Sequence, residues 1–249
     1  MIDTHTHVTS CRDDPAEVLA RGRAAGVHRF ITIGSSSQEM AEAAALADGH
    51  PDVFTTAGLH PHYAADWSDA IGDEIRSRAA HPRCVAIGET GLDWFRARAP
   101  RDAQVNAFRA QLAIARELDL PVVIHCRDAT DDCFDLLADE APPIVVLHCF
   151  AATDRLDDAI ERGWYCSFAG NVTYGSAIAL QEAARSVPDE LILLETDAPY
   201  LSPVPHRGRP NEPAYVMETL TFVAGLRDVA PTVLADRVEL NANRAFSLA

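Results

Sequence analysis

Short apolar runs alternate along the whole chain with longer stretches that have helical periodicity. Eight runs have strand length, and they finish near His7, Gly34, Leu59, Glu89, His125, His148, Phe168 and Asp197. The runs are almost continuously apolar, as in Pro121-Val122-Val123-Ile124, which is typical of strands buried on both faces of a parallel sheet. The pattern therefore predicts eight buried, parallel strands.

The stretches between the runs have the spacing of helices that pack on a sheet. In the segment Arg101–Leu118, three apolar residues (Phe108, Leu112 and Ala115) recur at three- and four-residue steps and would form one face. Further helices are predicted over Pro15–Ala25, Ser37–Asp48, Asp66–Ala80, Ala129–Glu140, Asp154–Arg162, Ser176–Val187, Glu212–Gly225 and Pro231–Ala245. Eight strand–helix units in 249 residues predict an α/β fold, the (β/α)8 TIM barrel. A doubly wound open sheet is the alternative, but its Gly-x-Gly-x-x-Gly turn does not follow the first run.

The chain shows no linker, low-complexity stretch or break in composition, so we expect a single domain over residues 1–249. A 48% hydrophobic content is enough to bury a large core. The first residues lack a basic region followed by an apolar stretch, and no apolar run approaches membrane length. We therefore expect a cytoplasmic protein that makes no membrane contact, and the sequence indicates no obligate protein partner.

Potential metal ligands end five of the predicted strands. They are His5, His7, Glu89, His125, His148 and Asp197. A single histidine in such a place is usually structural, but the carboxyl ends of barrel strands share one rim, where active sites lie. The joint placement therefore predicts a metal centre at that rim.

The number and type of these residues indicate two divalent ions, zinc, manganese or magnesium. His5 and His7 are two residues apart, so on a strand both imidazoles point to the same side. Six histidine and carboxylate ligands exceed what one open catalytic ion needs. We assign catalytic roles to Glu89, placed to bridge two ions, and to Asp197, as a ligand or the acceptor of a proton from the bridging water. Asp3 and Glu195 are expected to orient imidazoles or to fill the polar layer beneath them.

Further polar residues on this rim are candidate substrate contacts: His60, Arg127 and Arg209. Each has a structural alternative, namely a loop histidine, an ion pair at a helix start and a solvated loop. Two arginine groups, within residues 96–101 and 207–209, would add positive charge around the mouth of the barrel unless their loops are simply solvated.

The composition limits the reaction mechanisms and the modes of substrate binding that are possible. All 21 basic residues are arginine, which excludes mechanisms that need a Schiff-base lysine, a phosphate-loop lysine or a carbamylated lysine. The six cysteines include no Cys-x-x-Cys pair and are interpreted as buried thiols. A net charge of −16 argues against broad coating of nucleic acid but permits a nuclease with a short footprint.

Several motifs resemble, in order, those of the TatD family of metal-dependent deoxyribonucleases. They are Asp3-Thr4-His5-Thr6-His7, Gly58-Leu59-His60-Pro61-His62, Gly88-Glu89-Thr90-Gly91-Leu92-Asp93, His125-Cys126-Arg127-Asp128, His148-Cys149-Phe150, Glu195-Thr196-Asp197-Ala198-Pro199-Tyr200, Gly208-Arg209-Pro210-Asn211 and Asn241-Ala242-Asn243-Arg244. The resemblance extends from residue 3 to about residue 246. Departures are Trp94, where the family often has tyrosine, and Ala151-Ala152 in a rim loop.

The resemblance implies a TIM-barrel hydrolase of the amidohydrolase-like superfamily with divalent metals on the same six residues. A glutamate here stands where many superfamily members have a carbamylated lysine, in agreement with the lack of lysine. The implied activity is hydrolysis of DNA phosphodiesters, from the 3′ end of single strands, by attack of a metal-bound hydroxide. Two alternatives stay open: a hydrolase of small esters, amides, lactones or phosphoesters, and a non-catalytic scaffold with structural metals.

Overall fold

Eight strands and nine α-helices alternate along residues 1–248, the part of the chain that the computed structural model describes. The strands are β1 (Ile2–Thr6), β2 (Arg29–Thr32), β3 (Val53–Ala57), β4 (Cys84–Asp93), β5 (Val122–Arg127), β6 (Val145–Leu147), β7 (Tyr165–Phe168) and β8 (Ile192–Leu194). Their order in the sheet is the order of the sequence, and β1 also contacts β8. This strand order, with parallel pairing, is that of the (β/α)8 barrel, as predicted.

The helices follow the predicted pattern. They are α1 (Pro15–Ala25), α2 (Ser37–Gly49), α3 (Asp69–Ala79), α4 (Arg101–Leu118), α5 (Thr130–Glu140), α6 (Leu156–Glu161), α7 (Ile178–Ser186), α8 (Val216–Leu226) and α9 (Pro231–Phe246). The bounds of α1 and α4 match the prediction at both ends. Asp14 explains where α1 begins, because its carboxylate accepts hydrogen bonds from the N–H groups of Ala16 and Glu17.

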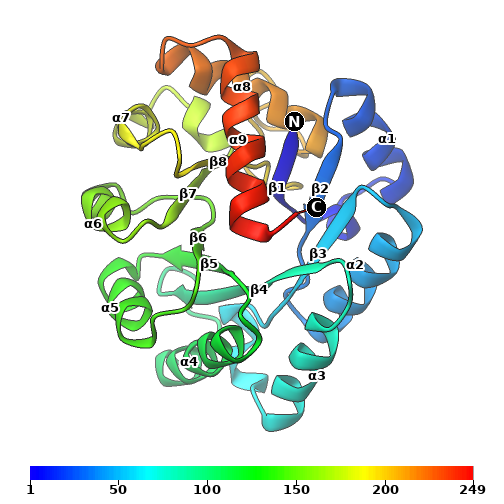
Figure 1. The fold of residues 1–249 in the computed structure, drawn as a ribbon, viewed down its shortest axis with the longest axis vertical. Helices are drawn as coiled ribbons and strands as arrows, with labels where there is room; N and C mark the ends of the chain where they lie inside the picture. The colour runs from blue at the N-terminus through cyan, green and yellow to red at the C-terminus, as the bar shows by residue number, and fades with distance from the viewer. Residues whose placement is uncertain (249) are drawn as a thin grey trace. The chain divides into compact units, whose positions relative to one another are not determined.

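Contacts divide the chain into two units. Unit 1 combines Met1–Thr32 with the chain from Cys149 onward, and unit 2 is Ile33–His148. In unit 2, α2 packs on β3 and α4 on β4, and Figure 1 shows α4 and α5 along the outside of their strands. In unit 1, α9 packs on β8 and β1. The expectation that residues 1–249 act as one domain stays a prediction.

The buried face of α4 is the predicted one. Phe108, Leu112 and Ala115 are fully buried, whereas the arginines of the same helix point to solvent. This division of apolar and charged positions fixes the rotation of α4 about its axis and therefore its packing on β4.

Three strands that lead to proposed ligands end elsewhere than predicted, and one of them, β5, continues past His125 to Arg127. β4 does not finish at Glu89 but continues to Asp93, because Thr90, Gly91 and Leu92 pair with Ile124, His125 and Cys126 of β5. β8 ends at Leu194, because the N–H of Thr196 donates to the Asp3 carboxylate. Glu89 and His125 therefore lie within strands, and Asp197 lies in a loop.

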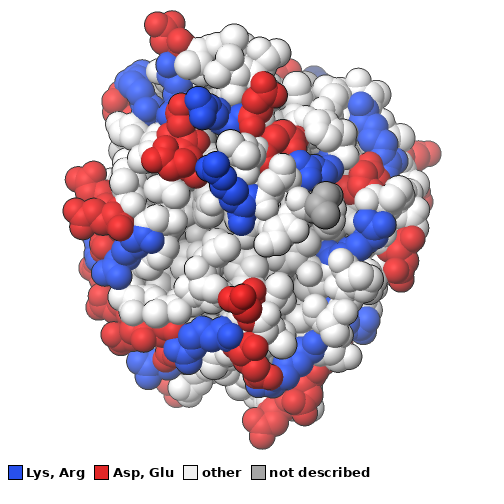
Figure 2. Space-filling view, in the orientation of Figure 1, with Lys and Arg blue, Asp and Glu red and all other residues white. Residues whose placement is uncertain are grey.

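The surface carries mixed charge. Acidic and basic side chains are interspersed over the face shown in Figure 2, with no continuous basic area on it. Among residues 1–248, no helix combines the length and the apolar character needed to cross a membrane.

Candidate metal centre

Three of the proposed ligands meet within unit 1. The Nε2 atoms of His5 and His7 are 3.4 Å apart, and Asp197 Oδ1 lies 3.8 Å and 3.5 Å from them, respectively. Backbone hydrogen bonds hold the group together: the N–H of Asp197 donates to the carbonyl of His5, and that of His7 to the carbonyl of Ala198. The strand β1 and the loop after β8 thus run side by side at the proposed ligands.

This group fits a divalent metal ion. A point equidistant from its three donor atoms would lie about 2.1 Å from each, close to the Zn–N and Zn–O bond lengths of about 2.0–2.2 Å. His7 and Asp197 keep 11% and 13% of their side-chain surface exposed, so water or a substrate could reach the open side. Two imidazoles and a carboxylate in this arrangement suit a catalytic ion more than a closed structural one.

Asp3 ties these elements together through the backbone. Its carboxylate accepts hydrogen bonds from the N–H and Oγ1 of Thr196, at 2.9 Å and 2.6 Å. Complete burial raises the pKa of Asp3 to about 8, although the bonds from Thr196 act against this. Asp3 therefore positions Thr196, the residue before Asp197. We expected Asp3 to orient an imidazole, but its described contacts include no histidine ring.

Asn211 holds the other side of the same loop. Its Nδ2 donates to the carbonyls of Thr196 and Tyr200, at 2.8 Å and 2.6 Å, and its N–H donates to the carbonyl of Pro199. The Gly-Arg-Pro-Asn motif quoted above thus includes a residue that fixes the Asp197 loop. Sequence reasoning had the motif but not this role.

The other three proposed ligands meet within unit 2, around Glu89. Oε1 of Glu89 lies 2.8 Å from His125 Nδ1 and 3.1 Å from His148 Nε2. Burial of this carboxyl raises its pKa, but the electrostatic interaction with the His60 and His148 rings and the hydrogen bonds from His125 and His148 outweigh burial and hold the pKa well below 4.5. Glu89 is therefore an anion at neutral pH, as a metal ligand must be.

His60, a candidate substrate contact, also faces Glu89. Its Nε2 lies 3.4 Å from Glu89 Oε1, and its Nδ1 accepts a hydrogen bond from the N–H of His62. Burial lowers the pKa of His60 to about 4, so the ring is neutral with its proton on Nε2. In this state the ring is a hydrogen-bond donor, and it is also placed to share a metal ion, because His60, Glu89 and His125 offer ligand atoms within 4.8 Å of one another.

Sequence reasoning missed Asp93, the last residue of β4. Asp93 Oδ2 lies 3.1 Å from His125 Nε2 and 3.0 Å from His62 Nε2. Burial raises the pKa of this carboxyl, but hydrogen bonds from His125, the N–H of Arg96 and His62 lower it overall. His125 can thus donate from Nε2 to Asp93 and offer Nδ1 to a metal, the usual support of a histidine ligand. Positions 89, 91 and 93 share one face of a strand, but this places Asp93 beside Glu89 only once β4 is known to continue past Glu89.

Gly91 lets β4 and β5 come close at this point. Its φ is +140°, and a Cβ there would lie 2.0 Å from the carbonyl oxygen of His125. Only glycine adopts this conformation without strain. The distance between Glu89 and His125 therefore depends on a residue that contributes no side chain.

The two candidate arginines lie outside these groups. Arg127 ends β5, is exposed and places its guanidinium 4.2 Å from the centre of the Phe95 ring. Arg209 is exposed in the loop after β8, and its carbonyl accepts a hydrogen bond from Ser202. Neither arginine is shown in contact with a proposed ligand, and their contact with a substrate stays a prediction.

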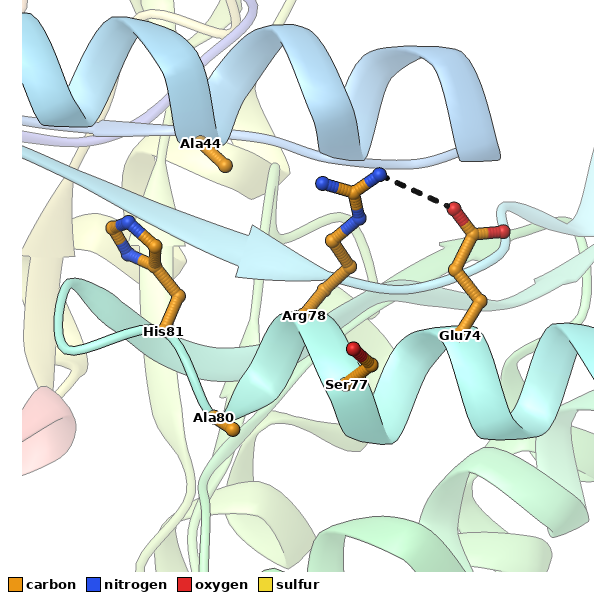
Figure 3. Close-up of a pocket in the computed structure, with 6 residues that line it drawn as sticks. All are labelled: Ala44, Glu74, Ser77, Arg78, Ala80 and His81. Atoms are coloured by element: carbon orange, nitrogen blue, oxygen red, sulfur yellow. Dashed lines mark ion pairs between the residues drawn. The ribbon is translucent and has the colours of Figure 1, made fainter.

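A hollow elsewhere in unit 2 is no rival site. It lies between α2 and α3 and is lined by Ala44, Glu74, Ser77, Arg78, Ala80 and His81 (Figure 3). Arg78 pairs with Glu74 across 3.6 Å, and His81 with Asp48 across 3.1 Å. Arg78 is thus paired within the lining and His81 with a residue outside it, and no residue of the lining is a proposed ligand.

Comparison with known proteins identifies relatives over the full length. The model of a family described as "TatD related DNase" matches residues 2–247. The 3'-5' ssDNA/RNA exonuclease TatD of Citrobacter rodentium is 40% identical over 259 residues, covering 100% of this chain and 98% of that protein. An uncharacterized metal-dependent hydrolase of Bacillus subtilis, YabD, is 33% identical and covers 100% of this chain and 99% of its own length.

Solved structures agree. The crystal structure of YJJV, a TatD homologue from Escherichia coli, has a TM-score of 0.94 at 27% identity, covering 100% of this chain and 98% of that one. A TatD-family hydrolase from Entamoeba histolytica, at 19% identity and a TM-score of 0.88, supports the fold alone and covers 99% and 97% of the two chains. The predicted fold and the resemblance drawn from the motifs are both confirmed.

Proposed function

The chain belongs to the family of TatD-related deoxyribonucleases, and on that premise we propose that it removes nucleotides from the 3′ end of single-stranded DNA. As a member of this family it is a metal-dependent hydrolase of phosphodiester bonds. The observation that supports the finer proposal is the 40% identity, over the whole chain, to a protein named as a 3'-5' exonuclease of single-stranded DNA and RNA. RNA is therefore a second substrate to test.

The proposed ligands of two divalent ions, zinc, manganese or magnesium, are unchanged. They are His5, His7 and Asp197 in unit 1 and Glu89, His125 and His148 in unit 2. When bound, such ions stabilise negative charge on phosphoryl oxygens and lower the pKa of a bound water.

We propose a separate role for each of the remaining polar side chains of the two units. We propose that the Asp197 carboxylate accepts the proton of the attacking water, because its loop is held on both sides by backbone hydrogen bonds. His60 is a neutral donor through Nε2 and would bind a phosphoryl oxygen. The exposed guanidiniums of Arg127 and Arg209 are proposed to contact neighbouring phosphates.

The charge of the protein limits how much nucleic acid it can hold. A net charge of −16 supports a short footprint at a strand end, with few phosphates bound outside the site. We propose that this reaction takes place in the cytoplasm and that residues 1–249 carry it out as one domain.

The test is the degradation of one single-stranded oligonucleotide that is labelled at either its 5′ or its 3′ end. Metal-stripped protein receives Mg²⁺, Mn²⁺ or Zn²⁺ in separate reactions. We expect metal-dependent release of the 3′ label as a mononucleotide and a ladder of shortened 5′-labelled strands. An RNA strand of the same sequence shows whether the sugar matters.

The matched variants are Asp197→Asn and Asp139→Asn, an exposed carboxylate on α5. The first is expected to lose the activity, and the second to keep it. If the folded, metal-loaded protein cleaves no nucleic acid but hydrolyses a small ester, the small-molecule hydrolase replaces this proposal. Release of the 5′ label as a mononucleotide would show that degradation starts at the 5′ end.

A further inference from the structure

Phe95 is an exposed aromatic residue beside the unit 2 group. Its side chain is 57% exposed, although a phenyl ring is normally among the most buried side chains. It lies in the turn after β4, two residues beyond Asp93, whose carboxylate contacts His125. Single exposed apolar residues are common, so exposure alone assigns no role to Phe95.

The turn that carries Phe95 is rigidly held. Arg96 donates its N–H to Asp93 Oδ1 at 2.6 Å, and Trp94 donates its N–H to the carbonyl of Arg127 at 2.9 Å. The buried side chain of Gln104 binds both the N–H and the carbonyl of Asp93 and also the carbonyl of Ala99. The exposure of Phe95 is therefore a property of a fixed turn and not of a loose loop.

Two cationic groups lie on the Phe95 ring. The guanidinium of Arg127 is 4.2 Å from the ring centre and that of Arg96 is 5.7 Å from it. Beside them, Arg101 lies 4.6 Å from the Trp94 ring, whose Nε1 donates to Asp132. Guanidiniums held over aromatic rings stay available to phosphates at their edges, because the ring occupies only their face.

We propose that Phe95 is a base-stacking residue of the active site. An unpaired base next to the cleaved phosphodiester would stack on the exposed part of its ring that the two guanidiniums leave uncovered, while Arg96 and Arg127 contact the adjoining phosphates. This inference rests on the proposed function and adds to it a source of substrate selectivity. Stacking on an aromatic side chain tolerates every base, since each has a π face, and it requires a base that is free of its duplex.

The experiment removes the ring from the protein and, separately, the base from the substrate. The protein variants are Phe95→Leu, which keeps apolar volume without a π face, and Phe95→Trp, which keeps one. The substrate is a short single strand that either is complete or carries an abasic residue beside the cleaved bond. Ile178→Ala, at an exposed apolar side chain on α7, is the control.

On the complete strand, Phe95→Leu is expected to raise KM about tenfold with kcat changed less than about twofold, as loss of one stacked base predicts. Phe95→Trp and Ile178→Ala should keep the KM of the unmodified protein. On the abasic strand, the unmodified protein and Phe95→Leu should have the same KM. The preference for a single strand over a blunt duplex should also shrink in Phe95→Leu.

The failure of this inference is distinct from that of the proposed function. If the unmodified protein degrades DNA but Phe95→Leu has the same KM on the complete strand, Phe95 does not stack on the substrate. If the abasic residue raises the KM of the unmodified protein and of Phe95→Leu equally, the missing base was bound elsewhere. If the unmodified protein degrades no nucleic acid, the proposed function fails and this inference fails with it.

Discussion

Replacing Gly91 by alanine should destabilise the protein far more than one added methyl group suggests. The new Cβ would lie 2.0 Å from the His125 carbonyl oxygen and 2.9 Å from its carbon. Both atoms belong to the backbone, so no side chain can move aside and β4 and β5 must separate. Backbone strain at a φ of +140° and overpacking each cost about 1–3 kcal/mol, so the free energy of unfolding should fall by about 2–6 kcal/mol.

The control is another glycine-to-alanine substitution in unit 2, at Gly49. A Cβ at Gly49, the last residue of α2, meets no atom within 4 Å. Gly49→Ala should therefore be neutral or stabilising by up to about 1 kcal/mol, because alanine favours the helix. Urea unfolding of both variants, followed by circular dichroism, gives the two free energies.

Activity supplies a second measurement. A shift of the His125 backbone by about 1 Å should lower the hydrolysis rate of folded Gly91→Ala by about a hundredfold, whereas Gly49→Ala should keep full activity. If the free energy of unfolding of Gly91→Ala lies within about 0.5 kcal/mol of that of the unmodified protein and its activity is normal, the requirement for close approach of β4 and β5 is refuted.

Four further predictions concern the site and its surroundings. Glu89→Gln should lower turnover by at least about a hundredfold, because a buried anion among the histidines is lost; near-normal steady-state rates with added Mn²⁺ would exclude its role. Chelation should lower the melting temperature of the unmodified protein and Mn²⁺ or Zn²⁺ should restore it, because an ion at a hundredfold excess over its Kd raises the free energy of unfolding by about 2.7 kcal/mol; a calorimetric scan that is insensitive to metal would contradict the proposed metal centre. Burial raises the pKa of Glu239, but the hydrogen bond and charge of Arg29 lower it below 4.5 overall, so this carboxylate stabilises the fold above pH 4.5 and less as the pH falls through its folded pKa. The free energy of unfolding of Glu239→Gln should therefore be lower than that of the unmodified protein at pH 7, and the difference should shrink at low pH. A difference that does not change with pH would reject this assignment. Cleavage should weaken only slightly between 50 and 200 mM salt, unlike the loss of about 10³–10⁵ found for proteins with six to ten phosphate contacts, and a steep slope would rule out the short footprint.

Local pattern was enough to predict the elements of the fold. The periodicity of Phe108, Leu112 and Ala115 predicted the buried face of α4, because a helix on a sheet needs one apolar stripe, and the predicted bounds of this helix match as well. The apolar runs predicted the strands for a similar reason, since a parallel sheet is buried on both faces. Strand ends were less certain: β4 extends four residues beyond Glu89 because β5 pairs with it, and no local signal in β4 records that pairing.

The sequence by itself determined which residues we propose to carry the chemistry, because histidines and carboxylates can supply such ligands and because their motifs keep the family's order. The tertiary structure decided how they work together. Asp93 supports His125, and His60 becomes a neutral donor, only because the loop after β3 and the end of β5 meet β4 there. Ring tautomers, pKa shifts and the exposure of Phe95 all depend on neighbours that are distant in sequence. Packing brings those neighbours together, and no local pattern specifies them.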